Sequence, residues 1–597
     1  LAHKHSTHGQ PPMFICQIDF EKAFDKVPRW ALWKRLEERG VCGGMMKVLQ
    51  KCYERVCLRV KVNGSLSSPF ASMQGVKQGC PKSTDLFGVF IESLADYIDA
   101  WDRQKPDSET YASAAPVIGG KKVTCLLYAD DLTLCALSIY RMQFLLNRLY
   151  EFCTAFGMRV NIAKCEMLVF APTPYHRAMA TAHAAALSYG PGMIRIPIKE
   201  RARYLGLYYG PGTRFDSCYQ ELLAAGKRAA FALINTLSKK GCLAPGIMYT
   251  CFEVQVRSVL SYGVEVWGPD ALFSLFEGTS YGGYGRNEER ALRAKWRKAR
   301  VLFDKALTDP MVAVQTSFLC RTVGANRPTH RLLYAEFAAM PLHLHWARLV
   351  FGFWNRIIRQ SSSLARTFLE DALEDARAAG FMRDCWVSKI YSVCKALGYD
   401  WLVKCPEGVQ GLHAWVMRTE LPIGELLEEF TKRMMQEWSI SGLDVDPRSF
   451  PEAEGRGRTG APGVKMCRYL QWMGLPQADA LIEHGKLAHM RDFVPYKHVT
   501  ALIRFRLGCW DIEANRPVRN GVRRARSLRW CRVCGEERVE DEKHVLLECP
   551  AYNQLRIAYG FTGLCMKEVM IVSDVRKLAA FLYSAHTTRN SQLRILS

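Results

Sequence analysis

Three aspartates lie where apolar stretches of the sequence end, and carboxylates in such positions can hold metal ions. Asp19 ends one apolar run, and Asp130 and Asp131 follow another, residues 125–129. Carboxylates gathered near a core raise one another's proton affinity unless cations neutralise them. Mg²⁺ prefers oxygen ligands, and two such ions can activate an attacking hydroxyl and stabilise a leaving pyrophosphate. The pattern fits metal-dependent phosphoryl transfer, although a single aspartate at a strand end is more often an ordinary loop acid.

A second set of ligand-type residues lies near the C-terminus. Cys531, Cys534, His544 and Cys549 have the spacing C-x2-C-x9-H-x4-C. Three thiolates and one imidazole make a closed tetrahedral set for structural Zn²⁺, and each half can grip the ion from a tight turn. The spacing predicts one zinc ion that folds this segment. The alternative is that two cysteine-rich turns occur here by accident.

The residues just before this set form a basic arm. There is no acid between residues 516 and 532, and the residues that we expect to contact nucleic acid are Arg516, Arg519, Arg523, Arg524, Arg526, Arg529 and Trp530. Arginine binds phosphate in a planar fork and stacks on bases, so the basic arm suits RNA or single-stranded DNA. A second basic stretch, residues 286–300, can equally be a solvated helix face.

The composition agrees with a nucleic-acid partner. The chain has 597 residues, with 81 Lys and Arg against 58 Asp and Glu and a formal net charge of +23. Such an excess predicts a polyanionic partner, because phosphate neutralisation dominates affinity for nucleic acids. A hydrophobic content of 49% excludes a disordered tail protein, and the longest stretch without Asp, Glu, Lys or Arg, 178–194, is too short to span a membrane. The 22 scattered cysteines favour a reducing compartment.

The elements that must position the aspartates alternate between strand and helix patterns. We expect strands at 13–19, 123–128 and 167–170, helices at 30–39, 83–101 and 140–156, a hairpin that turns at Asn63-Gly64, and a surface loop at 110–120. Strands interleaved with helices in this order predict an α+β domain with its helices on one sheet face. We expect Asp25 to cap the helix that Pro28 begins.

The pattern changes from Tyr219 onward. Apolar and small residues recur at helical spacing from Leu222 to Leu237, and helical patterns continue to about residue 440. Residues 444–464 combine prolines and glycines with charges, and they are the best candidate for a flexible linker.

Several ordered sequence blocks resemble the reverse transcriptases of LINE-type non-LTR retrotransposons. They are residues 18–28 (IDFEKAFDKVP), 75–81 (GVKQGCP), 128–131 (YADD), 161–166 (NIAKCE), 203–206 (RYLG) and 260–268 (LSYGVEVWG). Their order and spacing make the resemblance specific, whereas the YADD block alone would be weak. Residues 544–550 (HVLLECP), with Tyr552 and Arg556 after them, resemble the C-terminal zinc segment of many LINE-type proteins.

The resemblance implies a role for each of the three aspartates. Asp19, Asp130 and Asp131 would be the carboxylates of a polymerase palm and would hold two Mg²⁺ ions, with the carbonyl of Phe20 as a further metal ligand. The 3′ hydroxyl of a primer would attack the α-phosphate of an incoming dNTP between these ions.

The resemblance also implies roles for residues around the nucleotide. Phe24 would stand at the sugar gate, where a bulky ring disfavours a ribose 2′ hydroxyl; alternatively, it is a core aromatic. Gln78 and Gly79 would line the dNTP and template side of the pocket, or they form an ordinary turn. Lys164 would protonate the leaving pyrophosphate, or it is a solvated surface lysine.

The chain departs from the family pattern at two places. Lys82 stands where the family usually has an apolar residue, and Thr84-Asp85 stands where a Ser-Pro step is common. Only 18 residues precede Asp19, so we expect a piece of a longer gene product that holds only part of the fingers.

The expected fold is α+β: a right-hand polymerase palm with partial fingers, then a helical thumb, a long all-helical region and a small zinc-binding C-terminal segment. The expected segments are 1–210 for the palm with partial fingers, 211–330 for the thumb, 331–443 for the helical region, 444–464 for the linker, 465–515 for a helical segment, 516–560 for the basic arm and zinc knuckle, and 561–597 for a C-terminal tail.

The function that the resemblance implies is RNA-templated DNA synthesis. The partners would be an RNA template, a DNA primer and target, and dNTP, with no membrane, and the cofactors would be two Mg²⁺ ions and one Zn²⁺ ion. Such enzymes act in the nucleus. Two alternatives remain open: a catalytically inactive nucleic-acid-binding remnant of such an element, and a related palm polymerase such as an intron maturase, against which the motif order and the zinc segment argue.

Overall fold

The structure is a computed structural model that describes most of the 597 residues. The described residues are 11–104, 115–211, 215–239, 244–277, 302–325, 328, 330–360, 363–381, 385–435, 495–510, 512–515, 518–519, 522–571 and 574–595. They group into two compact units, one within residues 1–218 and 362–385 and the other within residues 219–361 and 386–597.

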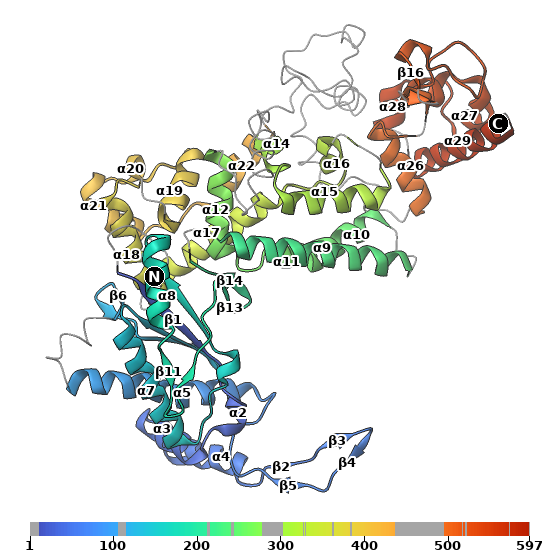
Figure 1. Ribbon diagram of the computed structural model, residues 1–597. Helices are drawn as coiled ribbons and strands as arrows, with labels where there is room; N and C mark the ends of the chain where they lie inside the picture. The colour runs from blue at the N-terminus through green and yellow to red at the C-terminus, as the bar shows by residue number, and fades with distance from the viewer. Residues whose placement is uncertain are drawn as a thin grey trace. The chain divides into compact units, whose positions relative to one another are not determined.

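A four-stranded antiparallel sheet forms the centre of the first unit (Figure 1). Its strand order is β10 (Glu166–Phe170), β1 (Met13–Ile18), β9 (Asp131–Ala136) and β8 (Cys125–Tyr128). β1 is central because it pairs with both β10 and β9. The strand pattern predicted β1, β8 and β10, but it missed β9, which begins at the second aspartate of the Asp130-Asp131 pair.

Alternate residues of β1 face two different cores. Phe14, Cys16 and Ile18 belong to a large core that the sheet shares with its helices. Met13 and Ile15 belong to a smaller cluster on the opposite face. The period of two is that of a strand, and burial on both faces explains why β1 is apolar almost throughout.

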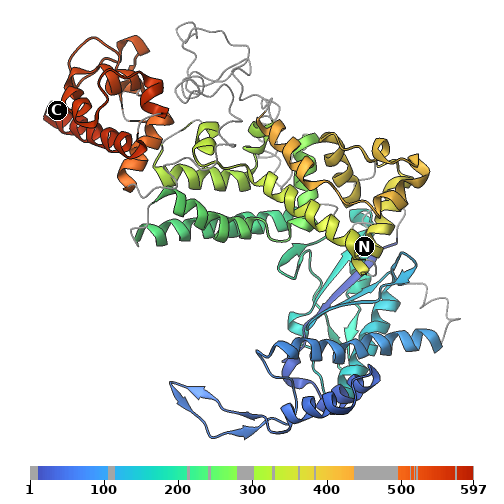
Figure 2. The same cartoon turned by 180° about the vertical axis from the view of Figure 1, so that it is seen from behind.

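Helices cover the large-core face of the sheet (Figures 1 and 2). The helices of the first part of the chain are α2 (Ala23–Lys26), α3 (Arg29–Glu38), α4 (Gly43–Glu54), α5 (Pro81–Gln104), α7 (Ile139–Phe156) and α8 (Pro174–Ala184), and a 3-10 turn, η1, spans Ile162–Lys164. The Ser138 hydroxyl caps α7 by accepting from the Arg141 N–H, and Gly157 ends the helix with a φ of 67°. The sequence predictions for α3, α5 and α7 are confirmed to within a few residues.

Two-stranded ribbons extend from this core. They pair β2 (Cys57–Leu58) with β5 (Phe70–Ala71), β3 (Lys61–Val62) with β4 (Ser65–Leu66), β6 (Val117–Ile118) with β7 (Lys121–Lys122), β11 (Ser188–Tyr189) with β12 (Ile194–Arg195), and β13 (Ala202–Tyr204) with β14 (Leu207–Tyr209). The predicted turn at Asn63-Gly64 is confirmed, with φ values of 49° and 86°. The expected loop at 110–120 is wrong in part, because β6 and the turn of its hairpin lie at its end.

One later helix, α18 (Leu364–Ala378), also belongs to the first unit. The carboxylate of Asp371 accepts a hydrogen bond of 3.3 Å from the N–H of Gly119, in the turn between β6 and β7. A Cβ at Gly119 would lie 2.5 Å from a methyl carbon of Thr367, so this approach requires glycine. From the sequence we expected α18 to belong to the separate helical region, because a contact between segments so far apart leaves no local pattern.

The second unit is largely helical, as the pattern from Tyr219 predicted. Its helices before residue 436 are α9 (Asp216–Lys239), which starts at the boundary, α10 (Pro245–Gln255), α11 (Arg257–Leu260), α12 (Val264–Glu277), α14 (Leu302–Ala306), α15 (Pro310–Val323), α16 (His330–Glu336), α17 (Leu342–Arg359), α19 (Trp386–Ala396), α20 (Trp401–Lys404), α21 (Gly408–Val416) and α22 (Ile423–Met435). Trp267 and Trp346 meet edge to face at 5.1 Å between α12 and α17, and a buried Lys389–Asp270 ion pair joins α19 to α12.

The C-terminal part of the second unit has its own hydrophobic core. Its elements are α26 (Tyr496–Arg506), η2 (Glu513–Asn515), β15 (Val518–Arg519), β16 (Val522–Arg523), η3 (Arg526–Leu528), η4 (His544–Glu548), η5 (Pro550–Tyr552), α27 (Asn553–Tyr559), α28 (Met566–Ile571) and α29 (Val575–Ile595). The expectation of a tail at 561–597 is corrected, because Val569 of α28 and Phe581 of α29 are fully buried in this core.

Some expectations fall outside the described residues. They are the linker at 444–464, the basic stretch at 286–300, residues 465–494 of the helical segment expected at 465–515, and Arg516. The backbones of Arg519, Arg523 and Arg526 are described, but their side chains are not. Among the helices that the structure describes, none is both long and apolar enough to cross a lipid bilayer.

Candidate functional site

Antiparallel pairing brings Asp19 beside Asp131 at one end of the central sheet. Ile18 of β1 lies opposite Leu132 of β9. Continuing this register by one residue places Asp19 alongside Asp131, the first residue of β9. A two-strand register is therefore what joins two carboxylates that are more than one hundred residues apart in the chain.

The hairpin between β8 and β9 brings Asp130 to the same place. Tyr128 pairs with Asp131, so Ala129 and Asp130 form a two-residue turn. Ala129 has a positive φ of 52°, which a non-glycine residue adopts infrequently and which turns the chain back tightly. The YADD block thus puts one aspartate in the turn and one at the start of a strand.

The negative charges of Asp130 and Asp19 act on the carboxylate of Asp131. Burial raises the pKa of Asp131, and the neighbouring charges of Asp130 and Asp19 raise it further. Asp130 and Asp131 are exposed, and the Asp19 side chain is 40% exposed, so the group is open to solvent. The structure therefore brings the three predicted aspartates together in an accessible position.

Two further sequence blocks meet this carboxylate group. The N–H of Asn161 donates to the carbonyl of Asp19 over 2.8 Å, and the Nζ of Lys164 lies 3.9 Å from the Asp19 carboxylate. From the next block, Tyr204 lies near Asp131: burial raises the pKa of its phenol, and the Asp131 charge raises it further. The Lys164 side chain is 69% exposed. It is therefore solvated and also lies close to the Asp19 carboxylate.

Phe20 and Phe24 follow Asp19 and differ in burial. Phe20 is 6% exposed and is bridged to Val160, with hydrogen bonds that use the Asp19 carbonyl and the Glu21 N–H. These bonds do not involve the Phe20 carbonyl. Phe24 is half-buried and stacks on Phe87 of α5 at 4.9 Å, so it is packed against the core without being enclosed by it.

The block 75–81 forms a loop that packs on the residues after β1. The N–H groups of Gly75 and Val76 donate to the carbonyls of Val27 and Phe24 over 2.8 Å each. A Cβ at Gly75, whose φ is 83°, would lie 2.8 Å from the Asp25 carbonyl oxygen, which explains this glycine. Gly79 also has a positive φ, of 79°, and it is exposed like Gln78.

The prediction that Asp25 caps the helix begun by Pro28 is wrong. Pro28 is the N-cap of α3, and no side chain caps that helix end. The Asp25 carboxylate instead accepts a hydrogen bond of 3.3 Å from the Gln78 amide. Local spacing suggested a cap, but the loop that arrives from residue 75 offers a different donor.

Arg29 is a positioning residue that the sequence analysis missed. Its guanidinium donates to the carbonyls of Ser72 (2.7 Å), Gly75 (3.0 Å), Tyr53 (3.1 Å) and Gln74 (3.1 Å). Tyr53 lies in α4, and the other acceptors follow β5, so one side chain ties together two distant chain segments. A basic residue after a helix-starting proline carries no local sign of this role.

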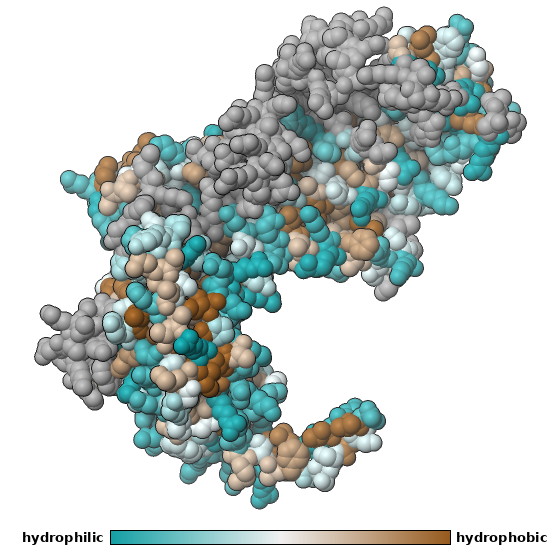
Figure 3. All heavy atoms as spheres, in the orientation of Figure 1, coloured by the Kyte–Doolittle hydropathy of each residue, from teal (hydrophilic) through white to brown (hydrophobic). Residues whose placement is uncertain are grey.

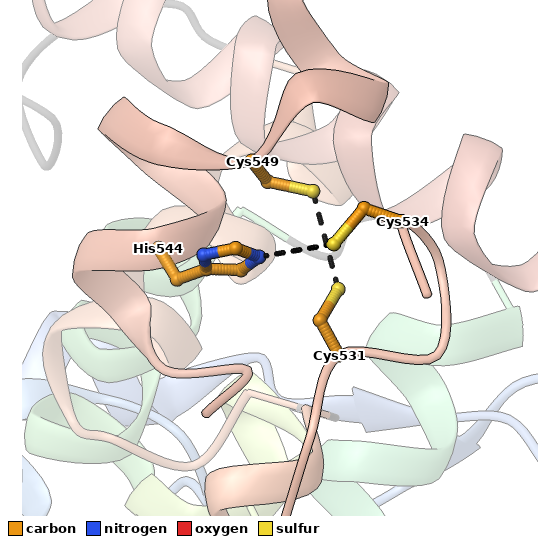
Figure 4. Close-up of side chains that lie close together, drawn as sticks. All are labelled: Cys531, Cys534, His544 and Cys549. Atoms are coloured by element: carbon orange, nitrogen blue, oxygen red, sulfur yellow. Dashed lines mark hydrogen bonds between the residues drawn. The ribbon is translucent and has the colours of Figure 1, made fainter. Parts of the chain in front are cut away.

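The C-terminal ligand set is gathered in one place, as its spacing predicted (Figure 4). The candidate ligand atoms of Cys531, Cys534, His544 and Cys549 all lie within 4.8 Å of one another. The Sγ atoms of Cys531 and Cys549 are 3.9 Å apart, and the Cys534 Sγ is 3.5 Å from the His544 Nε2. In the described part of the chain, these four residues are the one group of three or more possible ligand side chains that lie this close together. The carboxylate oxygens of Asp19, Asp130 and Asp131 are therefore farther apart than the ligand atoms of this set.

Chemistry and burial make this Cys3His set suitable for a metal ion. The hydrogen bond from Cys549 holds the pKa of Cys531 well below its usual range, while the same contact raises the pKa of Cys549. The Glu548 carboxylate lies 4.0 Å from the other ring nitrogen of His544, which is close for an ion pair but too far for a hydrogen bond. Arg556 donates to the Cys549 carbonyl over 2.5 Å, which fixes the last ligand.

The basic arm needs a correction at two of its arginines. Arg529 is 4% exposed, and its guanidinium donates to the Ala514 carbonyl over 2.7 Å and to the Arg524 carbonyl over 3.0 Å. Arg524 donates to the buried carboxylate of Glu513 over 2.6 Å. These two arginines hold the fold together and are not free to bind phosphate. Trp530 is 41% exposed and remains available for stacking.

Comparison with known proteins bears on the first unit. Residues 2–209 match the family described as reverse transcriptase (RNA-dependent DNA polymerase). The chain is 27% identical over 212 residues to the retrovirus-related Pol polyprotein from type-2 retrotransposable element R2DM of Drosophila melanogaster, over 35% of this chain and 19% of that protein. It is 28% identical over 154 residues to the retrovirus-related Pol polyprotein from type-1 retrotransposable element R2 of Popillia japonica, over 25% of this chain and 23% of that protein.

Two other similarities are more limited. The chain is 28% identical over 156 residues to the Transposon TX1 uncharacterized 149 kDa protein of Xenopus laevis, over 26% of this chain and 11% of that protein. Among solved structures, telomerase from Candida albicans in complex with the TWJ fragment of telomeric RNA has a TM-score of 0.24 and 11% identity, over 55% of this chain and 52% of that chain. The chain spans less than a quarter of the length of these three curated relatives.

Proposed function

We propose, because residues 2–209 form a reverse transcriptase domain distantly related to those of R2 and TX1 retrotransposon proteins, that this chain is the RNA-directed DNA polymerase of a LINE-type retrotransposon. Its reaction transfers a nucleotide from dNTP to the 3′ hydroxyl of a primer paired with an RNA template. The first unit would be the palm with part of the fingers, and the helices from α9 onward would begin the thumb.

The observation that carries the proposal is the meeting of Asp19, Asp130 and Asp131 at one open end of the sheet. The strand register and the β8–β9 turn support this meeting, and the raised pKa of Asp131 agrees with it. An acidic cluster alone would be weak support. These aspartates, however, come from two sequence blocks of the region that matches the family, and Lys164 from a third block lies close to Asp19.

A site of three oxygen-donor side chains fits Mg²⁺. Asp19, Asp130 and Asp131 would hold two ions, with the Phe20 carbonyl as a further ligand. Bound there, Mg²⁺ would supply the positive charge that activates the primer hydroxyl and stabilises the leaving pyrophosphate. The exposure of the carboxylates leaves room for the phosphates of the substrate.

Other residues of the chain would act on the nucleotide. Lys164, whose Nζ lies 3.9 Å from the Asp19 carboxylate, would give a proton to the leaving pyrophosphate. Phe24, packed on Phe87 but not enclosed, can exclude a 2′ hydroxyl by its bulk. Gln78 and Gly79 lie on the loop that contacts Asp25 and can line the nucleotide and template side.

The C-terminal part would support nucleic-acid binding. Cys531, Cys534, His544 and Cys549 would hold one structural Zn²⁺, because all four are gathered within 4.8 Å. Arg519, Arg523, Arg526 and the exposed Trp530 would then contact nucleic acid. The partners are an RNA template, a DNA primer and target, and dNTP, and the place of action in this proposal is the nucleus.

Primer extension tests the proposal. The purified chain, with any upstream sequence of its gene restored, should extend a DNA primer on an RNA template with Mg²⁺, and Asp130→Ala should abolish extension. The control Glu37→Gln removes an exposed carboxylate from α3 and should leave extension unchanged. Equal extension by wild type and Asp130→Ala eliminates the metal role. Duplex binding without any extension by wild type supports the inactive remnant instead.

A further inference from the structure

The segment from Cys57 to Ala71, named the hairpin arm here, is exposed at every residue. Figure 1 shows the hairpin arm, which includes β2 to β5, extending from the first unit, and Figure 3 shows hydrophobic residues along it. A two-stranded ribbon is at best marginally stable alone in water. An exposed ribbon with apolar surface therefore indicates a partner that covers it.

Exposed apolar side chains alternate with basic ones in the first half of the hairpin arm. Leu58, Val60, Val62 and Phe70 are 47%, 52%, 60% and 48% exposed, respectively. Leu58 of β2 lies opposite Phe70 of β5, and Lys61 of β3 lies opposite Leu66 of β4, so the second ribbon places a basic and an apolar side chain on the same face. Arg59 and Lys61 lie between the apolar residues in the sequence.

The charge around the hairpin arm selects the kind of partner. Between Glu54 and Asp85 there is no acid, and the basic residues in this interval are Arg55, Arg59, Lys61, Lys77 and Lys82. The net charge of the whole chain, +23 over 597 residues, is far more dilute. A ribbon with a purely basic charge complement fits a polyanion better than it fits a second copy of the same positively charged chain.

The base of the hairpin arm is anchored to the loop at 75–79. Arg29 donates to the carbonyl of Tyr53 before the first strand and to those of Ser72, Gln74 and Gly75 after the last one. The Ser72 N–H also donates to the Val56 carbonyl over 2.8 Å. The exposed strands therefore start from a fixed base, which gives a bound partner a defined position relative to Gln78.

We propose that the hairpin arm binds the RNA–DNA duplex formed by template and primer. Arg59 and Lys61 contact phosphates, and the apolar side chains beside them pack on sugars of the wide, shallow minor groove of an A-form helix. This inference rests on the proposed function, because it takes the duplex of a reverse transcriptase as the partner. It adds a contact region outside the carboxylate group and its nucleotide-binding loop.

The test measures binding of a fluorescent 20-base-pair RNA–DNA duplex to the full chain by anisotropy, without Mg²⁺. The double variant Arg59→Glu/Lys61→Glu should weaken binding about tenfold or more and lower the slope of log affinity against log salt by about 2, because two phosphate contacts are lost. The matched control Lys121→Glu/Lys122→Glu makes the same charge change on the β6–β7 ribbon and should weaken binding much less.

A second variant tests the exposed apolar side chains of the hairpin arm. Val60→Ser/Val62→Ser should weaken duplex binding without changing the salt slope, because no charge is removed. Circular dichroism should show that the hairpin arm variants keep the fold, since every altered side chain is exposed. Wild-type binding by Arg59→Glu/Lys61→Glu overturns the proposal. So does a Val60→Ser/Val62→Ser variant that binds duplex normally but loses self-association in sedimentation, because the partner is then a second copy.

The outcomes separate this inference from the proposed function. Asp130→Ala should bind the duplex like wild type, because the measurement needs no catalysis. If wild type fails to extend a primer while the hairpin arm variants still lose binding, the polymerase proposal fails and the hairpin arm remains a duplex-binding element. If wild type extends the primer and the hairpin arm variants bind normally, only the hairpin arm proposal fails.

Discussion

The carboxylate group of the first unit and the Cys3His set of the second are both candidate metal sites, yet they are built in opposite ways. Asp130 and Asp131 are exposed, and the Asp19 side chain is 40% exposed. In contrast, Cys549, His544 and Cys531 are 0%, 1% and 2% exposed. The first group has free access from solvent, whereas three members of the second are enclosed by the fold and Cys534 is half-buried.

This difference indicates different tasks. A structural metal site uses all its positions for protein ligands, whereas a catalytic site keeps positions open for substrate. The aspartates come from a strand end and a hairpin turn that the apolar sheet already holds in place, so their removal should spare the fold. The thiolates lie in short turns around a small core, so their removal should cost the fold.

The largest expected effect is the loss of zinc. Cys531→Ser/Cys534→Ser should lower the zinc content from one ion per chain to none and unfold the C-terminal part, because structural Zn²⁺ supplies on the order of 10 kcal/mol of folding free energy. Elemental analysis and hydrogen exchange of residues 495–595 check both effects. The control Cys565→Ser alters an exposed cysteine outside the set. Unchanged zinc content in the double variant would refute the site.

The next effect concerns chemistry without the fold. Asp130→Ala should slow primer extension by about 10³-fold or more, because metal charge contributes several kcal/mol to transition-state stabilisation. The midpoint temperature of its thermal unfolding should not fall, because the change removes a charge that raises the pKa of Asp131. Single-turnover kinetics and circular dichroism measure the two effects. A large loss of thermal stability would mean that the aspartate supports the fold, contrary to the expected difference between the carboxylate group and the Cys3His set.

The next prediction concerns a buried ion network that stabilises the C-terminal part of the second unit. Arg589 of α29 donates to both carboxylate oxygens of Glu540 over 2.7 and 2.8 Å and lies 3.6 Å from Glu513. Arg589→Met should destabilise the C-terminal part by about 3 kcal/mol, because it leaves the buried Glu540 carboxylate without its arginine partner. Urea unfolding followed by Trp fluorescence measures this loss. Lys577→Met, an exposed change on the same helix, should have little effect.

The smallest expected effect concerns Lys164, which lies beside the carboxylate group. Lys164→Met should slow nucleotide incorporation by about 10²-fold if its ammonium protonates pyrophosphate, with little change in duplex affinity. Lys164→Arg, which keeps the charge near Asp19 but is a poorer proton donor, should recover only part of the rate. Rapid-quench kinetics provides the measurement. A Lys164→Met enzyme as fast as wild type would assign this residue to the solvated surface.

Much of the first unit was predictable because its signals are local. The apolar run before Asp19, the glycine after Arg39 and the Asn63-Gly64 turn each reflect a preference of a few neighbouring residues. The strand β9 was missed because the two aspartates looked like the end of an element, whereas the second one begins the next strand. The grouping of Cys531, Cys534, His544 and Cys549 was predictable from spacing, because each pair is separated by only a few residues.

Other roles depended on partners far away in the chain. Arg524 and Arg529 looked like members of a solvent-facing basic arm, but Glu513 and the Ala514 carbonyl draw them into the fold. Arg29 looked like an ordinary helix residue, and Asp25 looked like a cap. Most partners of Arg29 and the partner of Asp25 follow β5, and a contact between segments that far apart in the chain leaves no local pattern.

The amino-acid sequence by itself determined which side chains can carry chemistry and which segments are strands, helices and turns, because side-chain type and short-range periodicity are local properties. The tertiary structure decided which of those side chains meet. Strand register placed Asp19 beside Asp131, close packing enclosed the thiols while leaving the carboxylates open, and long-range hydrogen bonds turned two arginines inward. Proximity and burial arise only when distant segments pack together, and they separate an open site from a closed one.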